Sequence, residues 1–129
     1  MNGDIYEGEW LDNLRSGKGI LTLANLDFYD GEWLEDLRHG KGTSDNLGIG
    51  KYIGEWIKDK RHGSGEFIYR SGDRYVGTFE ENKRSGKGIL YYTDGGRYVG
   101  TWKNNKQHGK GKIFYSNGDL LEGEWRFNK

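Results

Sequence analysis

Three histidines recur at one position of the sequence and suggest a metal site or an acid–base cluster. His39, His62 and His108 each precede a Gly-x-Gly motif. If these motifs belong to successive β-hairpins, neighbouring copies lie two strands apart, roughly 9.5 Å, whereas two nitrogens that share one zinc lie at most about 4 Å apart. Ser16 and Ser85 occupy the same position in other copies and suit that metal poorly. We therefore expect structural histidines and no metal site.

No other motif in the sequence predicts catalysis or a cofactor. The chain has no Cys, which excludes disulfides, thiolate metal ligands and a Cys nucleophile. Gly17-Lys18-Gly19 and its copies lack the length and the Lys-Ser/Thr ending of a phosphate-binding P-loop. A motif that recurs along a chain suits a repeated surface better than a single active site. We therefore expect no enzyme activity and no cofactor, with a regulatory part of a larger enzyme as an alternative.

Basic side chains concentrate at positions 12–18 and their copies, which hold 12 Lys or Arg against 5 Asp or Glu. Each Lys or Arg that reaches an anionic membrane contributes about 1 kcal/mol to binding. Solvated loops with local ion pairs are the other interpretation, because Asp36 and Asp59 lie among the basic residues. The formal net charge of zero argues against a nucleic-acid partner. The predicted edge for anionic phospholipid consists of Arg15, Arg38, Arg61, Arg84, Lys87 and Lys110.

Aromatic side chains recur in a Tyr-x-Gly-x-Trp motif. A single-layer sheet has no second layer to cover such rings, and open apolar patches usually mark interaction sites. We therefore expect the rings to line a groove that binds a peptide or helix of another protein. The alternative is that the rings pack only on one another and on glycine. The predicted groove residues are Tyr29, Trp33, Tyr52, Trp56, Tyr75, Phe79, Tyr98 and Trp102.

The motifs share one period, because Tyr-x-Gly-x-Trp and Gly-x-Gly both recur every 23 residues without insertion or deletion. Each unit predicts a β-hairpin: a first strand such as 73–79, a polar loop at 81–85, a second strand at 86–92 and a tight Asp94-Gly95 turn. About eleven strands follow. Tyr, Gly and Trp of one strand share a face. We expect the rings to lie over glycines of the next strand, where a Cβ would collide with them.

This combination of Tyr-x-Gly-x-Trp, Gly-x-Gly and Asp/Asn-Gly-x-x-Tyr resembles the MORN repeat (membrane occupation and recognition nexus). The resemblance covers residues 1–129 as about five and a half repeats of 23 residues. They begin near 2, 25, 48, 71 and 94, with a final half repeat from 117. It implies an all-β fold, namely an elongated single antiparallel sheet of tandem β-hairpins with a concave aromatic groove. Members of the family mostly serve as binding or scaffolding modules, several of them in ciliary and cytoskeletal proteins.

The preferred interpretation is a non-catalytic scaffold or adaptor for protein–protein interaction in a cytoskeletal or ciliary assembly. The alternative is a peripheral membrane adaptor that binds anionic phospholipids. The N-terminal residues show no signal peptide, and the mean hydropathy of −0.99 comes with no apolar run of about 20 residues. We expect a cytoplasmic location, associated with cytoskeleton or cilium, or peripheral at a membrane.

Two features depart from the regular repeat. In the second repeat, Ser44 and Asn46 stand where the other repeats carry apolar residues, which predicts a bend, a bulge or a notch for a partner. The edge strands expected at 4–11 and 120–127 are open to pairing. Residues 1–64 carry 12 acidic and 8 basic side chains, and residues 65–129 carry 8 and 12. The opposite charges of the two halves predict homo-oligomers joined through the ends of the sheet.

Overall fold

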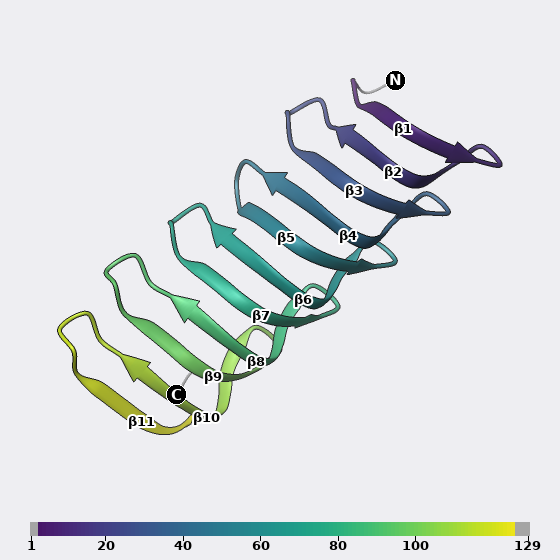
Figure 1. Cartoon of the computed structure of the whole chain (residues 1–129). Coiled ribbons are helices and arrows are strands. Elements are labelled where there is room, and N and C mark those ends of the chain that lie inside the picture. The colour runs from purple at the N-terminus through teal and green to yellow at the C-terminus, as the bar shows by residue number, and fades with distance from the viewer. Residues whose placement is uncertain (1–2, 126–129) are drawn as a thin grey trace.

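The computed structural model describes residues 3–125, which form one antiparallel sheet of 11 strands in sequence order. Each hairpin lies beside the next, so that β1 and β11 are at opposite ends of an elongated ribbon (Figure 1). This confirms the predicted fold. The final residues of the predicted edge strand, 126–127, lie outside the described residues. The strands are β1 (Ile5–Leu11), β2 (Leu14–Thr22), β3 (Phe28–Leu34), β4 (Leu37–Asn46), β5 (Gly50–Ile57), β6 (Lys60–Tyr69), β7 (Arg74–Glu80), β8 (Lys83–Tyr91), β9 (Arg97–Lys103), β10 (Lys106–Phe114) and β11 (Leu120–Trp125).

The tip of each hairpin is a two-residue turn. Glu81 and Asn82 have φ of 46° and 72°, and positive φ at both central residues is what a type I′ turn requires. The same pair of positive φ values recurs at the equivalent residues of every hairpin from β1–β2 to β9–β10. The loop predicted at 81–85 is therefore too long, because residues 83–85 already belong to β8. Paired backbone, rather than loop, carries their charged side chains.

A bulge follows each turn and explains the first glycine of Gly-x-Gly. Gly8 pairs with Gly19 and Trp10 pairs with Arg15, so that one residue of β1 faces three of β2. Gly17, inside the bulge, has φ of 86°, and a Cβ there would lie 2.7 Å from the Glu9 carboxylate. L-residues with side chains rarely adopt such a φ. This glycine is thus needed for backbone conformation and not, as predicted for both glycines, for a ring.

The second glycine of each Gly-x-Gly does lie under a ring. A Cβ on Gly88 would overlap the hydroxyl and ring atoms of Tyr75. The Tyr75 hydroxyl passes over the glycine and donates a hydrogen bond of 2.9 Å to the Thr78 carbonyl. Equivalent overlaps occur for Tyr6, Tyr29, Tyr52 and Tyr98 over Gly19, Gly42, Gly65 and Gly111. The predicted ring-over-glycine packing is confirmed at this position.

The core is a row of aromatic rings that crosses the sheet. Tyr75 meets Phe79 of its own strand at 5.2 Å between ring centroids and Trp102 of the next repeat at 5.4 Å, both edge to face. Such T-shaped pairs suit the ring quadrupole. Because each tyrosine contacts the ring of the following repeat as well as its own, the row is continuous from Tyr6 to Trp125. We call this side of the sheet the ring face.

Candidate binding groove

The predicted groove residues lie together on the ring face, but as its core. The exposed fraction of every one of these eight side chains is 5% or less, and Tyr52, Tyr75 and Tyr98 are at 0%. A partner would first meet the layer above them. Direct contact between a partner and the rings stays a prediction. The eight residues are Tyr29, Trp33, Tyr52, Trp56, Tyr75, Phe79, Tyr98 and Trp102.

The layer above the rings is built by the predicted arginine ladder. Arg38 lies in β4, and its Cζ is 4.4 Å from the centroid of the Trp56 ring in the next repeat. Arg15 over Trp33 and Arg84 over Trp102 have the same distance. A guanidinium over a tryptophan face is attracted by the ring quadrupole. The arginines are therefore packed across the ring face and do not project from loops.

Each of these arginines also binds the turn of the following hairpin. The Nε of Arg38 donates to the Asp59 carboxylate at 3.1 Å, its Nη2 to the Asp59 carbonyl at 2.9 Å, and its backbone N–H to the same carboxylate at 2.7 Å. Arg15 binds Asp36 through the same three bonds. The backbone N–H of Arg15 is the main cause that lowers the pKa of the Asp36 carboxyl. One side chain thus ties each repeat to the next.

The partner of the arginine changes halfway along the ladder. Arg61 makes these bonds to Asn82, and Arg84 makes them to Asn105. An amide accepts the same hydrogen bonds as a carboxylate but carries no charge. The first two arginines are therefore neutralised within the ladder, and the third and fourth are not. Burial lowers the pKa of Arg61, but an arginine stays protonated at physiological pH.

The six residues of the predicted phospholipid edge do not form one edge. The four arginines cover the ring face, whereas Lys87 and Lys110 lie on the opposite face of the sheet. Lys110 lines a surface hollow there together with Ile89, Val99 and Phe114. The reason is the alternation of side chains along a strand, which places Lys87 opposite to Arg84 and Gly88. Lipid binding itself stays a prediction.

The tyrosine hydroxyls of the ring face serve as structural donors. Tyr29, Tyr52 and Tyr98 each donate to the backbone carbonyl three residues onward, at 2.8, 2.8 and 3.1 Å. Burial raises the pKa of Tyr52 to about 12, and it raises the pKa of Tyr29 and Tyr98 in the same direction. These phenols therefore keep their protons at neutral pH, and nothing in their surroundings prepares them as acid–base groups.

A hollow of about 450 Å³ opens on the ring face at the second repeat. Ser44 lies in it, at the position that Leu21, Phe67 and Leu90 fill in other repeats. Strand β4 is regular there, since Ser44 pairs with Tyr29 on one side and with Tyr52 on the other. The predictions of a bend or a bulge at this point are therefore wrong. The strand is regular, and the volume that an apolar side chain fills in other repeats is empty over Ser44. Its lining includes Arg15, Leu21, Trp33, Arg38, Asp45, Ile49, Trp56, Asp59, Arg61 and Phe67.

Comparison with protein families agrees with this architecture. The family model of the MORN repeat matches residues 6–28, 29–45, 52–74, 75–97 and 98–120. The chain belongs to the MORN-repeat family. The predicted recognition is confirmed, and the MORN repeat is a non-catalytic repeat type. The match to the second MORN repeat ends at residue 45, beside the hollow over Ser44. No curated protein was found to match the chain.

The three histidines of the MORN repeats lie in strands β4, β6 and β10. Within residues 3–125 there is no group of three or more His, Cys, Asp or Glu side chains that could hold a metal ion. His62 accepts a hydrogen bond of 3.4 Å at Nδ1 from the Glu81 backbone N–H of the next repeat. Over the same residues, no helix is long and apolar enough to cross a membrane.

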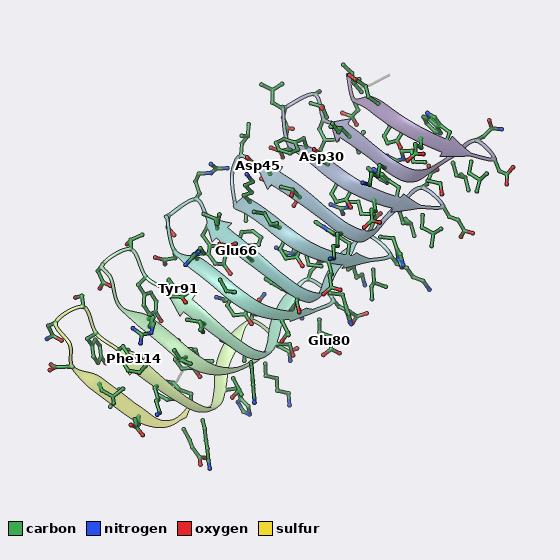
Figure 2. The ribbon with its side chains drawn as sticks, viewed as in Figure 1. Asp30, Asp45, Glu66, Glu80, Tyr91 and Phe114 are labelled. Carbon is green, nitrogen blue, oxygen red and sulfur yellow. The ribbon has the colours of Figure 1, made fainter. Side chains whose placement is uncertain are left out.

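Sequence analysis missed the face opposite the rings. There Val76 pairs with Ile89, which pairs with Val99, and Val76 is 38% exposed. Asp30, Asp45, Glu66, Tyr91 and Phe114 follow one another over the hairpins on this face (Figure 2). Along this face apolar side chains such as Ile53 and Ile89 lie among charged ones such as Glu66, Lys87 and Lys110. The alternation of side chains along each strand could have predicted these apolar residues, but the apolar surface was expected only on the face that carries the aromatic rings.

Proposed function

We propose that this MORN-repeat chain is a non-catalytic scaffold that binds another protein in the groove of its ring face. The hollow over Ser44 carries the proposal, because its apolar volume is missing from one repeat while the strand beneath remains regular. Its volume lies within the range of about 300–1,000 Å³ that is usual for binding sites. Trp33, Trp56 and Phe67 at the base would supply the apolar contact.

The substitution Ser44→Leu tests this function, because it restores the residue type of Leu21 and Leu90. Full-length wild-type chain and variant would be coupled to resin, and the bound proteins of a cell extract identified by mass spectrometry. We expect the variant to lose a specific partner while melting no lower than the wild type. Thr43→Leu, on the opposite face of the same strand, is the matched control and should keep the partner. An identical set of bound proteins for all three would contradict a role for the groove.

A cytoskeletal or ciliary assembly is the setting that we propose for this scaffold, with the chain in the cytoplasm. The support is the MORN family membership, whose resemblance implies such roles. Immunofluorescence of the tagged chain, before and after detergent extraction of cells, tests the assignment. A tagged chain that is wholly extracted would contradict it, whereas the proposed location requires retention with the cytoskeleton or the axoneme.

A peripheral membrane adaptor is the second candidate function. The observation that favours it is the uncompensated charge of Arg61 and Arg84 on the ring face. Sedimentation with vesicles of anionic and of zwitterionic phospholipid, over a series of salt concentrations, separates the two functions. Binding to anionic vesicles that weakens with salt would support the adaptor. Equal sedimentation with both kinds of vesicle would remove it.

A further inference from the structure

The charge of the groove is set by the residue at the second position of each hairpin turn. Asp36 and Asp59 form ion pairs of 3.1 Å with Arg15 and Arg38. Asn82 and Asn105 occupy the same place for Arg61 and Arg84. Within residues 3–125, no carboxylate forms an ion pair with either of these later arginines. The arginine ladder is consequently compensated by carboxylates along its first two steps and carries uncompensated positive charge along the next two.

The later guanidiniums are held in place and still have donors to offer. Arg84 lies 4.4 Å above the Trp102 ring and uses Nε and Nη2 for Asn105, at 3.3 and 2.7 Å. Its Nη1 group has no hydrogen bond among the described residues. Arg61 is held over Phe67 at 4.9 Å and binds Asn82 with the same two nitrogens. A carboxylate from outside would meet a fixed cation that has already lost much of its side-chain freedom.

The hollow over Ser44 reaches the first of these cations. Arg61 and Asn82 line it together with Trp56 and Phe67, so that an apolar side chain seated over Ser44 would have Arg61 as a neighbour. Two carboxylates of the lining, those of Asp59 and Asp27, project toward this face and already have hydrogen-bond partners. Asp59 pairs with Arg38 at 3.1 Å. Asp27, at the other edge of the sheet, forms no ion pair among the described residues and accepts hydrogen bonds from the Leu47 backbone N–H at 2.8 Å and from the Asn25 side-chain amide at 3.2 Å. Near the hairpin turns that hold Asp59 and Asn82, the charge without an ion pair in the described residues is therefore the positive charge of Arg61, whereas the negative charge of Asp27 lies at the opposite edge of the hollow.

We propose that the groove selects a protein segment that joins one large apolar side chain to acidic side chains. This inference rests on the proposed function, since it specifies what the groove binds. The apolar side chain fills the hollow over Ser44, and the acidic side chains pair with Arg61 and Arg84. Equivalent positions of neighbouring repeats lie roughly 9.5 Å apart. That distance corresponds to about three residues of an extended segment or about six of a helix.

The structure supplies a substitution that removes the charge and keeps the fold. Asn82→Asp with Asn105→Asp reproduces at Arg61 and Arg84 the carboxylate bonds that Asp36 and Asp59 already make. We expect this double variant to melt at or above the temperature of the wild type. It should bind acidic segments about tenfold more weakly, because two exposed ion pairs are lost. Asp36→Asn with Asp59→Asn is the reciprocal variant and should extend the selection for acidic residues.

The probe is a random 15-residue peptide library displayed on phage and sorted against the immobilised full chain. On the wild type we expect enrichment of peptides with one aromatic or leucine anchor and with Asp or Glu at the spacings above. On the Asn82→Asp, Asn105→Asp variant the anchor should remain and the acidic enrichment should vanish. Synthetic copies of the selected peptides then give affinities by fluorescence anisotropy at two salt concentrations.

The outcomes separate this inference from the proposed function. Peptides that bind the wild type, fail on Ser44→Leu and show no acidic preference would overturn the inference and leave the function standing. If every peptide that binds the wild type also binds the Ser44→Leu variant, both the inference and the proposed function would be contradicted. An acidic preference that survives in the Asn82→Asp, Asn105→Asp variant would also overturn the inference. The inference would also be overturned if the wild-type chain bound phosphatidylserine vesicles but no peptide, and if the Asn82→Asp, Asn105→Asp variant lost the vesicle binding. Arg61 and Arg84 would then bind a membrane.

Discussion

The phenol ring of Tyr75 lies across Gly88 of the neighbouring strand, with its hydroxyl hydrogen-bonded beyond the glycine to the Thr78 carbonyl at 2.9 Å. No side-chain atom fits between this ring and the backbone beneath it. The ring is fully buried although the sheet has a single layer, because backbone covers it below and Arg84, 5.9 Å from its centroid, lies above. Glycine at this position is therefore part of the core.

Gly88→Ala should destabilise the fold by about 1–3 kcal/mol, the usual cost of overpacking. The added methyl group would displace the Tyr75 ring and weaken its contacts with Phe79 and Trp102. Thermal unfolding followed by circular dichroism measures the effect. Gly48→Ala is the matched control, because its nearest neighbour would be 3.6 Å away. Equal melting temperatures for Gly88→Ala and the wild type would contradict the packing.

Trp56→Ala should lower the free energy of unfolding by about 3–5 kcal/mol, as expected for a large buried aromatic residue. Trp56 is 4% exposed, contacts Tyr29 and Tyr52 edge to face, and supports the Arg38 guanidinium. Trp10, which is 58% exposed, is the matched control, and its replacement by Ala should cost much less. Urea unfolding gives both values. Similar losses for the two variants would show that the ring row does not carry the stability.

Alkaline pH should unfold the protein through its buried tyrosines. Burial raises the pKa of Tyr52 to about 12 and that of Tyr75 further, whereas both titrate near 10 in the unfolded chain. The folded state then holds more protons, so stability is intact below pH 10 and falls as the pH rises toward 12. Tyrosinate absorbance and circular dichroism, recorded together, should change in one step above pH 10. Full tyrosinate absorbance of a folded chain at pH 11 would contradict this.

Acid should weaken the contact between the first two repeats. The bonds from Arg15 lower the pKa of Asp36, so the stability that this carboxylate contributes is present above its unfolded pKa, near 3.9, and is lost as the pH falls below it. We expect the melting temperature of the wild type to exceed that of Asp36→Asn at pH 7 and to approach it at pH 2.5. A difference that stays constant over this range would show that the charge of Asp36 is irrelevant.

Association through the ends of the sheet stays a prediction that the structure makes more specific. In the described residues, β1 and β11 each pair on one side only, and Ile5 and Leu120 are 58% and 48% exposed. Light scattering over a range of protein and salt concentrations should show oligomers that weaken with salt, because the two halves carry opposite charge. Ile5→Lys should oppose pairing at β1. A monomer at high protein and low salt concentration would contradict self-association.

The sequence predicted the sheet, the strand number and the ring over Gly88, because these depend on a strict period and on alternation along strands. It failed at residues 83–85, since charged residues beside a turn resemble a loop and a two-residue tip can be recognised only from its φ values. The prediction that Arg84 projects from a loop was wrong for the same reason. The bulge adds two residues, which keeps Arg84 on the face of Gly88. Had the strand been extended to residue 83, alternation alone would have placed the arginine over the rings.

The hollow could be predicted only in part. Ser44 was recognisable as a gap in an apolar column, but whether the strand would bend or stay straight depended on its pairing with β3 and β5. The exchange of Asp59 for Asn82 was visible in the sequence, yet it had no meaning until the partner arginine was known. Tertiary pairing over 21 residues, such as that between Arg61 and Asn82, leaves no local signature.

Each arginine of the ladder binds the turn of the following hairpin, and each tyrosine of the motif contacts the rings of its own and of the following repeat. A unit of 23 residues can therefore be duplicated or deleted in register, and its neighbours would find the same contacts as before. The length of the sheet is therefore set by the number of repeats. Evolution can lengthen the sheet by whole repeats, and a substitution in one repeat, as at Ser44, can create a local feature without changing the other repeats.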